Sequence, residues 1–203
     1  MNIKISVTMS EVRISKEQLI NSYKTADNET KKTLEAIFGK EIFKPKDIKE
    51  RIKTFEDACN ELGQEHQLVR EYWDICHTGI MFGADIVAYL KLRIIAAALN
   101  EGWEPQFTED EWRYFPWFCL YTQSEIDEMS EEDKNRVVYR SYYNAYANGG
   151  VAYAYTSYDS SNTYTSIGSR LAFKTRELAE YAGEQFVEIW ADYVFKPEEK
   201  QGK

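Results

Sequence analysis

The sequence predicts an α+β fold with a helical N-terminal half and a small antiparallel β-sheet packed with a long C-terminal helix. Apolar residues recur at helical spacing through most of the first hundred residues. In the second half, alternating tyrosines flank Asn148-Gly149-Gly150, which is typical of a β-hairpin turn. Thr175 then precedes an amphipathic stretch that is expected to form the C-terminal helix, ending at about Phe195.

Short elements are expected in the N-terminal region. Thr54 with Asp57 forms a capping-box pattern, and Gly39 and Gly63 are typical residues at helix ends. Asn28 is expected to cap the second helix. The expected elements are a strand over 3–7 and short helices over 16–24, 29–38, 47–53, 54–63 and 64–77.

The longest predicted helix spans 84–101, where few polar positions interrupt the apolar ones, so it is expected to be buried on most sides. Thr108 and Glu111 form a second capping-box pattern, which predicts a short helix closed by Pro116. The remaining expected elements are a strand over 117–121, a helical turn in the acidic stretch 124–133, and strands over 137–146, 151–158 and 170–173.

Charge is unevenly distributed along the chain, whose net charge is −9. Residues 1–53 contain twelve Lys and Arg against eight Asp and Glu, whereas residues 54–203 contain thirteen against twenty-six. The predicted organisation is therefore a basic N-terminal region of a strand and short helices over 1–53 and a main α+β body over 54–203, unless both form one domain. The acidic body argues against nucleic-acid binding, which needs a cationic surface. The basic region leaves a DNA-associated regulator as an alternative.

The cysteines predict a reducing compartment. Cys59, Cys76 and Cys119 are odd in number and lack metal-binding or redox spacing, and no apolar secretory signal opens the sequence. The longest unbroken apolar run, 94–99, is far too short to cross a membrane. We therefore expect a cytoplasmic protein, or one carried in a virion assembled in the cytoplasm, with no membrane partner.

The motifs of common enzymes are absent from the sequence. It has no phosphate-binding glycine loop, dinucleotide fingerprint, HExxH, nucleophile elbow or paired CxxC. His66 and His77 would share one stripe of a helix but lie about 16 Å apart, too far to bind one metal. Cys76 and His77 are sequence neighbours and point apart on a helix. These absences argue against an enzyme but leave open a site assembled from scattered acids, and no cofactor or metal is expected. A helix-turn-helix over 54–77 is disfavoured, because its second helix would not be basic.

The tyrosine-rich segment over residues 139–169 is the main candidate for a binding surface. Eight Tyr, six Ser, three Asn and three Gly occupy twenty of its thirty-one positions, and only Arg140 and Asp159 are charged. With a two-residue turn, one face would carry Arg140, Tyr142, Asn144, Tyr146, Val151, Tyr153, Tyr155 and Ser157. The opposite face would carry Tyr139, Ser141, Tyr143, Ala145, Ala152, Ala154, Thr156 and Tyr158, and its small residues suit packing by the last helix. We call the first face the tyrosine face. It is broad and amphipathic, like binding surfaces that gain contact area at low entropic cost. Tyrosines at these positions can also serve purely structural packing.

Arg170 is a second candidate, because it follows the polar loop 159–169 and is expected at a strand edge near the tyrosine face. Its guanidinium could contact a phosphate or carboxylate, or form a structural salt bridge. The predicted ligand- or partner-binding set is Arg140, Tyr142, Asn144, Tyr146, Tyr153, Tyr155 and Arg170.

Several motifs carry a resemblance to a known family. They are 54–59 (TFEDAC), 98–103 (ALNEGW) followed by Pro105, 114–118 (YFPWF), 168–174 (GSRLAFK) and 177–183 (ELAEYAG). Together they span about residues 50–195, and this stretch resembles a family of phage, prophage and mobile-element proteins from gut anaerobes to which no activity is assigned. The resemblance implies an accessory protein: a virion component, an antagonist of host defence, or a binder of a host factor.

The leading hypothesis is a non-enzymatic phage or mobile-element protein that binds a protein partner or small polar ligand through the tyrosine face. A structural component of a virion, with the tyrosine face as an oligomer interface, is the first alternative. The DNA-associated regulator is the second.

Overall fold

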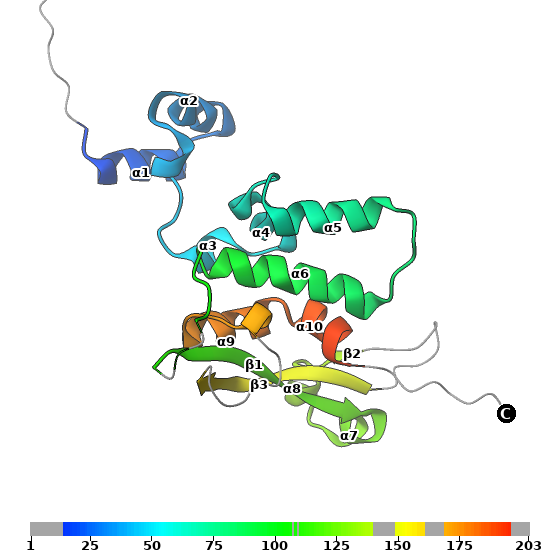
Figure 1. Ribbon diagram of the computed structural model, residues 1–203. Helices are drawn as coiled ribbons and strands as arrows, with labels where there is room; N and C mark the ends of the chain where they lie inside the picture. The colour runs from blue at the N-terminus through cyan, green and yellow to red at the C-terminus, as the bar shows by residue number, and fades with distance from the viewer. Residues whose placement is uncertain (1–13, 107, 109, 140–148, 161–168, 196–203) are drawn as a thin grey trace, which may run out of the picture. The chain divides into compact units, whose positions relative to one another are not determined.

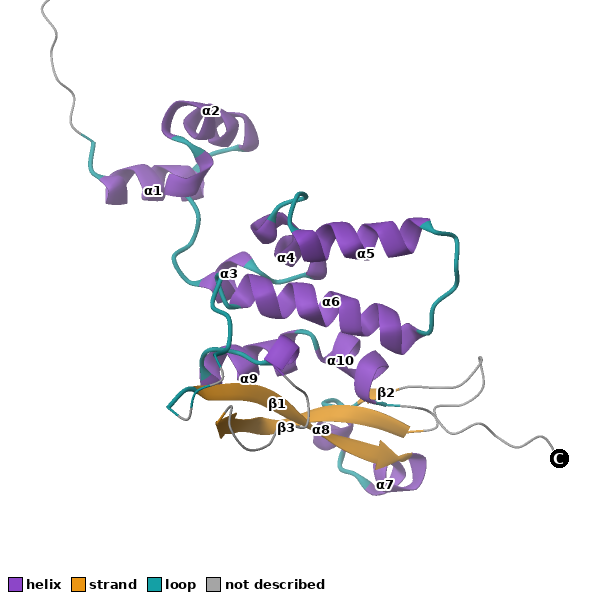
Figure 2. Ribbon diagram, viewed as in Figure 1, coloured by secondary structure: helices purple, strands orange, loops and turns teal. Residues whose placement is uncertain are grey.

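The structure is a computed structural model that describes residues 14–106, 108, 110–139, 149–160 and 169–195 (Figure 1). The chain divides into two compact units, Met1–Lys46 and Asp47–Lys203. The described residues form ten α-helices and one three-stranded antiparallel sheet, so the predicted α+β class is confirmed (Figure 2). The division falls after Lys46 rather than after residue 53, because Ile48 and Ile52 lie in the core of the second unit.

The first unit contains α1 (Lys16–Thr25), α2 (Asn28–Phe38) and the 3-10 turn η1 (Lys40–Ile42). The ring of Tyr23 stacks on Phe43 with centroids 4.2 Å apart, and its hydroxyl donates to the Glu35 carboxylate. The cap of α2 is Asp27, one residue before the predicted Asn28, and its carboxylate accepts the Thr30 N–H. The predicted strand over 3–7 lies outside the described residues.

The helical part of the second unit contains α3 (Ile48–Arg51), α4 (Phe55–Leu62), α5 (Gln67–His77) and α6 (Ala84–Leu99). Thr54 and Asp57 form the predicted capping box, and Gly63 ends α4 with a φ of +86°. The central helix α6 contacts α4, α5 and α10 (Val187–Val194), so it is covered on most sides, as its sequence predicts (Figure 1).

The sheet has the strand order β1-β3-β2, with β1 at Trp112–Thr122, β2 at Val138–Tyr139 and β3 at Gly149–Ser160. The predicted short helix before Pro116 is wrong, because Pro116 lies inside the edge strand β1. Tyr114 uses its outward-facing N–H and C=O to pair with Phe173. The backbone of Pro116, two residues further, faces the same way, so its missing N–H costs no bond to β3.

The predicted two-residue hairpin turn is also wrong. Strand β3 pairs along its whole length with β1. It pairs with β2 at Val138↔Val151 and Tyr139↔Gly150, so a tight turn at Asn148-Gly149-Gly150 does not join these strands. Residues 140–148, which lie between the two paired segments, are outside the described residues. The long strand pairing is therefore made by segments far apart in the sequence, from Thr122 opposite Gly149 to Trp112 opposite Ser160.

An irregularity in β3 separates two tyrosines that the sequence placed on one face. Trp117 lies opposite Tyr155, whereas the next residue, Phe118, lies opposite Tyr153, so Ala154 has no partner in β1. Because neighbouring residues of β1 point to opposite faces, Tyr153 and Tyr155 do so as well. The prediction of a shared face is wrong for this pair.

The two faces of the sheet also differ from the predicted packing. Helix α9 (Arg176–Gln185) covers the face of Tyr153: a Cβ built on Gly183 would lie 2.6 Å from the Tyr153 ring and 2.7 Å from Pro116. Ala152 packs instead with Ile126 and Val137 in a small separate cluster. The helix therefore packs on a tyrosine rather than on the alanine-bearing face.

The C-terminal elements are more broken than predicted. Phe186 separates α9 from α10, and the Trp190 indole N–H donates to the Ala182 carbonyl across the break at 3.2 Å. The predicted strand over 170–173 is a 3-10 turn, η2 (Ser169–Leu171), followed by Phe173. The acidic stretch forms two short helices, α7 (Gln123–Glu128) and α8 (Glu131–Lys134), as its composition predicts.

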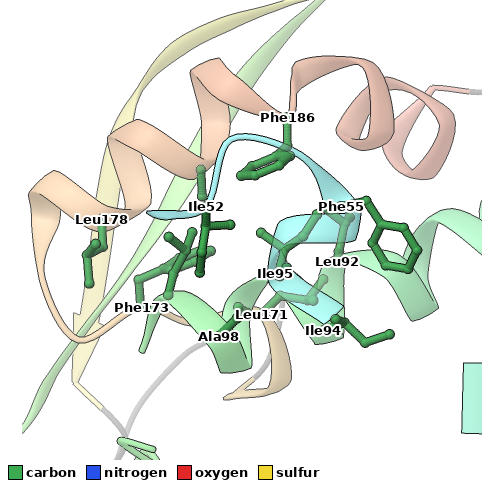
Figure 3. Close-up of a cluster of buried hydrophobic side chains, with 14 of the residues drawn as sticks. Ile52, Phe55, Leu92, Ile94, Ile95, Ala98, Leu171, Phe173, Leu178 and Phe186 are labelled. Atoms are coloured by element: carbon green, nitrogen blue, oxygen red, sulfur yellow. The ribbon is translucent and has the colours of Figure 1, made fainter. Parts of the chain in front are cut away.

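The main core lies between α6, α9 and η2 (Figure 3). Ile52, Ile95 and Phe173 come from segments far apart in the sequence and are each at most 1% exposed. Full burial of such a side chain contributes about 1.5–3 kcal/mol, so this cluster holds the helices and the bridge at Phe173 together.

Candidate functional site

A pocket of about 640 Å³ lies in the second unit, where the first turn of α5, the C-terminal half of α6 and the turn η2 meet. Small side chains leave the space open: Ala96 and Ala97 on α6 and Ala172, which follows η2, all line the pocket. Leu62, Leu68 and Pro105 supply apolar wall. The polar and aromatic residues that line it are His66, Arg93, Asn100, Trp103, Glu104 and Arg170.

Asn100, which is 4% exposed, ties α6 to the segment after η2. Its amide N–H donates to the Ala172 carbonyl at 2.8 Å, and its amide oxygen accepts the Lys174 N–H at 3.0 Å. Both partners lie more than seventy residues away in the sequence. These two bonds fix the two walls of the pocket to each other, since neither backbone group can shift without breaking a buried hydrogen bond.

Glu101, the residue after Asn100, forms ion pairs with two cations. Its carboxylate accepts from Arg51 Nη2 at 2.8 Å and from Lys174 Nζ at 3.0 Å. Hydrogen bonds from Arg51 and then Lys174 lower the pKa of Glu101 below its usual range. Lys174 also donates to the Asn100 carbonyl at 3.2 Å. Arg51 and Lys174 are thus engaged with Glu101, and neither belongs to the pocket lining.

Two arginines remain for the pocket. Arg93, on α6, is half-buried and pairs with Glu71 at 3.5 Å between Nη1 and Oε2, at the long end of hydrogen-bond distance. Arg170, on η2, is exposed, and within the described part of the chain its guanidinium makes no ion pair or hydrogen bond. Glu104 is the single carboxylate among the lining residues. The described lining therefore has an excess of positive charge.

His66 and Trp103 present oriented groups. The Leu68 N–H donates to His66 Nδ1 at 3.3 Å, so the ring caps α5 and its other nitrogen, Nε2, carries the proton in the neutral tautomer. The Trp103 indole N–H donates to Glu111 at 3.0 Å, which fixes the orientation of the ring. The Nε2–H donor of His66 and the flat face of the Trp103 ring are thus available to a ligand.

The structure describes only three of the seven predicted binding residues, namely Tyr153, Tyr155 and Arg170. Arg140, Tyr142, Asn144 and Tyr146 lie outside the described residues. Tyr153 is half-buried beneath α9 and shares a hydrogen bond of 2.9 Å with Thr156. Tyr155 is exposed on the other face, and Arg170 lines the pocket. The described members thus lie at three separate places.

Sequence reasoning missed the pocket itself. Arg93 and Trp103 come from one end of α6 and the loop after it, and His66 comes from the start of α5. Their distances along the chain match no local motif, and no pattern of spacing could have found them. The single usable signal was Arg170, a lone cation in a segment almost without charge.

A smaller hollow of about 310 Å³ lies where β1 begins and β3 ends, lined by Trp112, Tyr114, Tyr158 and Arg176. The Arg176 guanidinium carbon lies 5.9 Å from the Tyr114 ring centroid and 5.6 Å from that of Tyr158. Its Nη1 donates to the Thr156 carbonyl at 3.1 Å. The cation is therefore already bound to the aromatic rings by the chain itself.

Comparison with known proteins gives no further guide: no family profile matches the chain, and no curated protein or solved structure is significantly similar to it. No helix among the described residues is long and apolar enough to cross a membrane. Over the same residues, no cluster of three or more His, Cys, Asp or Glu side chains is arranged to hold a metal ion.

Proposed function

We propose that the protein is a non-enzymatic binding protein that takes a small anionic organic molecule in the pocket between α5, α6 and η2. The observation that carries the proposal is the pair Arg93 and Arg170 in one pocket. Residues 54–203 contain thirteen Lys and Arg against twenty-six Asp and Glu, a balance of −13. Two arginines facing one hollow are unusual in so acidic a body, and they favour an anionic ligand.

The residues around the arginines favour a particular kind of anion. Arginine binds carboxylate and phosphate groups with paired N–H donors. A volume of about 640 Å³ exceeds what an inorganic anion fills and lies in the usual range for organic ligands. Trp103 and Leu68 supply apolar surface on which a ring can rest. A phosphate or carboxylate attached to a flat ring, such as a nucleotide, fits these features.

The motif resemblance to phage and mobile-element proteins supports an accessory role for this binding, in the host cytoplasm or in a virion. A protein that sequesters or senses a small host metabolite would need no catalytic group of its own. This agrees with a pocket whose lining holds binding groups.

A ligand screen tests the proposal directly. Adenosine and guanosine monophosphates, benzoate and inorganic phosphate are added to the protein, and its melting temperature and binding heat are measured. An organic anion is expected to bind, with Arg170→Gln and Arg93→Gln each weakening it about tenfold or more, the cost of losing one charge-assisted contact. Ala97→Phe should block binding by filling the pocket.

The matched control is Arg70→Gln, because Arg70 is an exposed arginine on α5 that is not part of the pocket lining. It removes the same charge from the same unit and should leave binding unchanged. Equal loss in Arg70→Gln and Arg170→Gln would show that only general charge is sensed. Absence of binding by every organic anion in the screen, and of any co-purified anion by mass spectrometry, would refute the proposal.

A second candidate function is a protein interface at the exposed aromatic pair Trp117 and Tyr155. Their side chains are 43% and 52% exposed although they stack on each other. Aromatic residues of this kind are enriched in interfaces, which supports an oligomer contact at this pair. Light scattering of wild type and Trp117→Ser at high protein concentration decides it: a monomer in both cases excludes this interface.

A further inference from the structure

Figure 1 shows the loop that connects α5 to α6. The side chains of this loop expose an unusual amount of apolar surface. Ile80 is 64% exposed and Met81 is 97% exposed, and Phe82 follows directly at 37%. Trp73 on α5 and Ile86 on α6 flank the loop and are also exposed. Five of the fourteen exposed large hydrophobic residues in the described chain thus fall between positions 73 and 86. We call Trp73, Ile80, Met81, Phe82 and Ile86 the apolar tip.

Local bonds hold this loop in shape. The Thr78 hydroxyl donates to the Ile75 carbonyl at 2.8 Å and accepts the Ile80 N–H at 3.2 Å. Gly79, with a φ of +70°, allows the sharp turn between them. The three apolar residues 80–82 therefore come directly after a hydrogen-bonded turn.

Connecting two helices does not require these residue types. A loop of this length is normally polar, and three consecutive exposed apolar residues lower solubility unless they serve binding. Methionine and aromatic side chains are the types enriched at interfaces, and the flexible thioether of Met81 adapts to different partners. The composition of the apolar tip is that of a contact surface.

The charges around the apolar tip select the partner. Between Trp73 and Ile86 the chain carries Asp74 and Asp85 and no Lys or Arg, while Arg70 and Glu71 precede Trp73 on α5. Asp74 and Asp85 are exposed beside the tip, and Glu71 is paired with Arg93 at 3.5 Å. Two copies of the tip would bring like charges together, and an anionic lipid surface would be repelled. A basic surface would be attracted.

We propose that the apolar tip is a docking surface for a segment of another protein that carries an apolar anchor residue flanked by Lys or Arg. The anchor packs between Met81 and the aromatic side chains, and the flanking cations face Asp74 and Asp85. This site lies on residues other than those lining the α5–α6–η2 pocket, and it is independent of the ligand proposed there.

A random peptide library displayed on phage and selected on the full-length protein tests this surface. Enriched peptides are expected to combine Leu, Met or Phe with neighbouring Lys or Arg. Their affinity for the double variant Met81→Ser, Phe82→Ser should fall about tenfold or more, as for loss of interface anchors. Raising the salt concentration from about 50 to 300 mM should weaken binding severalfold, because exposed charges are screened.

The control is the double variant Ile37→Ser, Leu120→Ser, which removes two exposed apolar side chains elsewhere, at 66% and 53% exposure. It should bind the selected peptides as wild type does, and both double variants should keep the wild-type circular dichroism spectrum. Selection of no peptides, of peptides without basic residues, or of peptides that bind the Met81→Ser, Phe82→Ser variant equally well overturns the proposal.

Two other possible occupants of the apolar tip, a second copy of the chain and a membrane surface, are tested in parallel. Dimerisation in light scattering that disappears in the Met81→Ser, Phe82→Ser variant would assign the apolar tip to a second copy. Sedimentation with phosphatidylcholine vesicles that disappears in the same variant would assign it to a membrane surface. Either result overturns the proposal of a basic protein segment.

Discussion

The indole of Trp117 and the phenol ring of Tyr155 stack across two antiparallel strands, with centroids 5.8 Å apart and planes 15° from parallel. Both rings lie on the face of the sheet opposite α9, because the irregularity at Ala154 shifts Tyr155 away from the face of Tyr153. An exposed stack of this kind contributes to stability even where no core surrounds it.

This contact should be measurable as a coupling energy. Trp117→Ala and Tyr155→Ala together are expected to destabilise the protein by less than the sum of the single variants, with a coupling of about 0.5–1.5 kcal/mol. Urea unfolding of all four proteins gives the value. The pair Trp117 and Tyr158, on opposite faces, serves as a control cycle and should be additive. Additivity for Trp117 and Tyr155 would rule out the stack in solution.

Asn100 should be one of the least replaceable polar residues. Asn100→Ala removes the bonds to Ala172 and Lys174 and leaves buried backbone groups without partners. We expect the free energy of unfolding to fall by about 2–3 kcal/mol, the cost of unsatisfied buried groups. Chemical denaturation measures it, with Asn60→Ala on the exposed side of α4 as the control. A loss no larger than that of the control would contradict the bridging role.

Gly183 should not tolerate alanine. In most helices Gly→Ala stabilises by about 1 kcal/mol. Here the new methyl group would press on Tyr153 and Pro116 in the closely packed contact of α9 with the sheet, which costs about 1–3 kcal/mol. We expect a net lower melting temperature for Gly183→Ala. Glu184→Ala on the exposed side of the same helix should leave it nearly unchanged, and a rise in Gly183→Ala would disprove the close packing.

Stability should decline in alkaline solution. Burial raises the pKa of the Cys59 thiol and of the phenols of Tyr181 and Tyr193 above their usual values. These groups stabilise the fold fully below their unfolded pKa values, which are about 8.5 for Cys and 10 for Tyr. The benefit is lost as the pH rises through the folded pKa values, with a slope of up to about 1.4 kcal/mol per pH unit for each group.

Urea unfolding between neutral pH and about 10.5 checks this slope, since that range spans the unfolded Cys and Tyr pKa values. Tyr193→Phe removes the hydroxyl of a half-buried tyrosine and should make the decline shallower. Tyr155→Phe, which removes an exposed hydroxyl from the sheet, is the matched control variant. A free energy of unfolding that stays constant over this range would be inconsistent with buried neutral thiol and phenol groups.

Local signals predicted the helices well because their causes lie within a few residues. The capping box of Thr54 and Asp57 and the helix end at Gly63 stand where the sequence predicts them. The second capping-box pattern failed for an equally clear reason. The Glu111 carboxylate bonds the Trp103 indole, and the next residues pair with β3, so strand pairing outweighed a local helix signal.

The candidate site was less predictable than the fold. Arg170 was predicted from its place after the polar loop 159–169, but its neighbours in the pocket come from α5 and α6 and share no spacing with it. The tyrosine face depended on a two-residue turn and strict alternation. The observed pairing of Val138 with Val151 rules out the predicted turn, and the unpaired Ala154 breaks the alternation of side chains. Neither feature can be recognised from a local sequence pattern.

The sequence by itself determined the α+β class, the buried helix α6 and the excess of acid in the second unit, because periodicity, capping and charge are properties of neighbouring residues. The tertiary structure alone decided which face Tyr155 occupies and that Arg93 and Arg170 share one pocket. Those outcomes depend on strand register and on contacts between residues more than seventy positions apart, where packing and hydrogen bonding outweigh local preference.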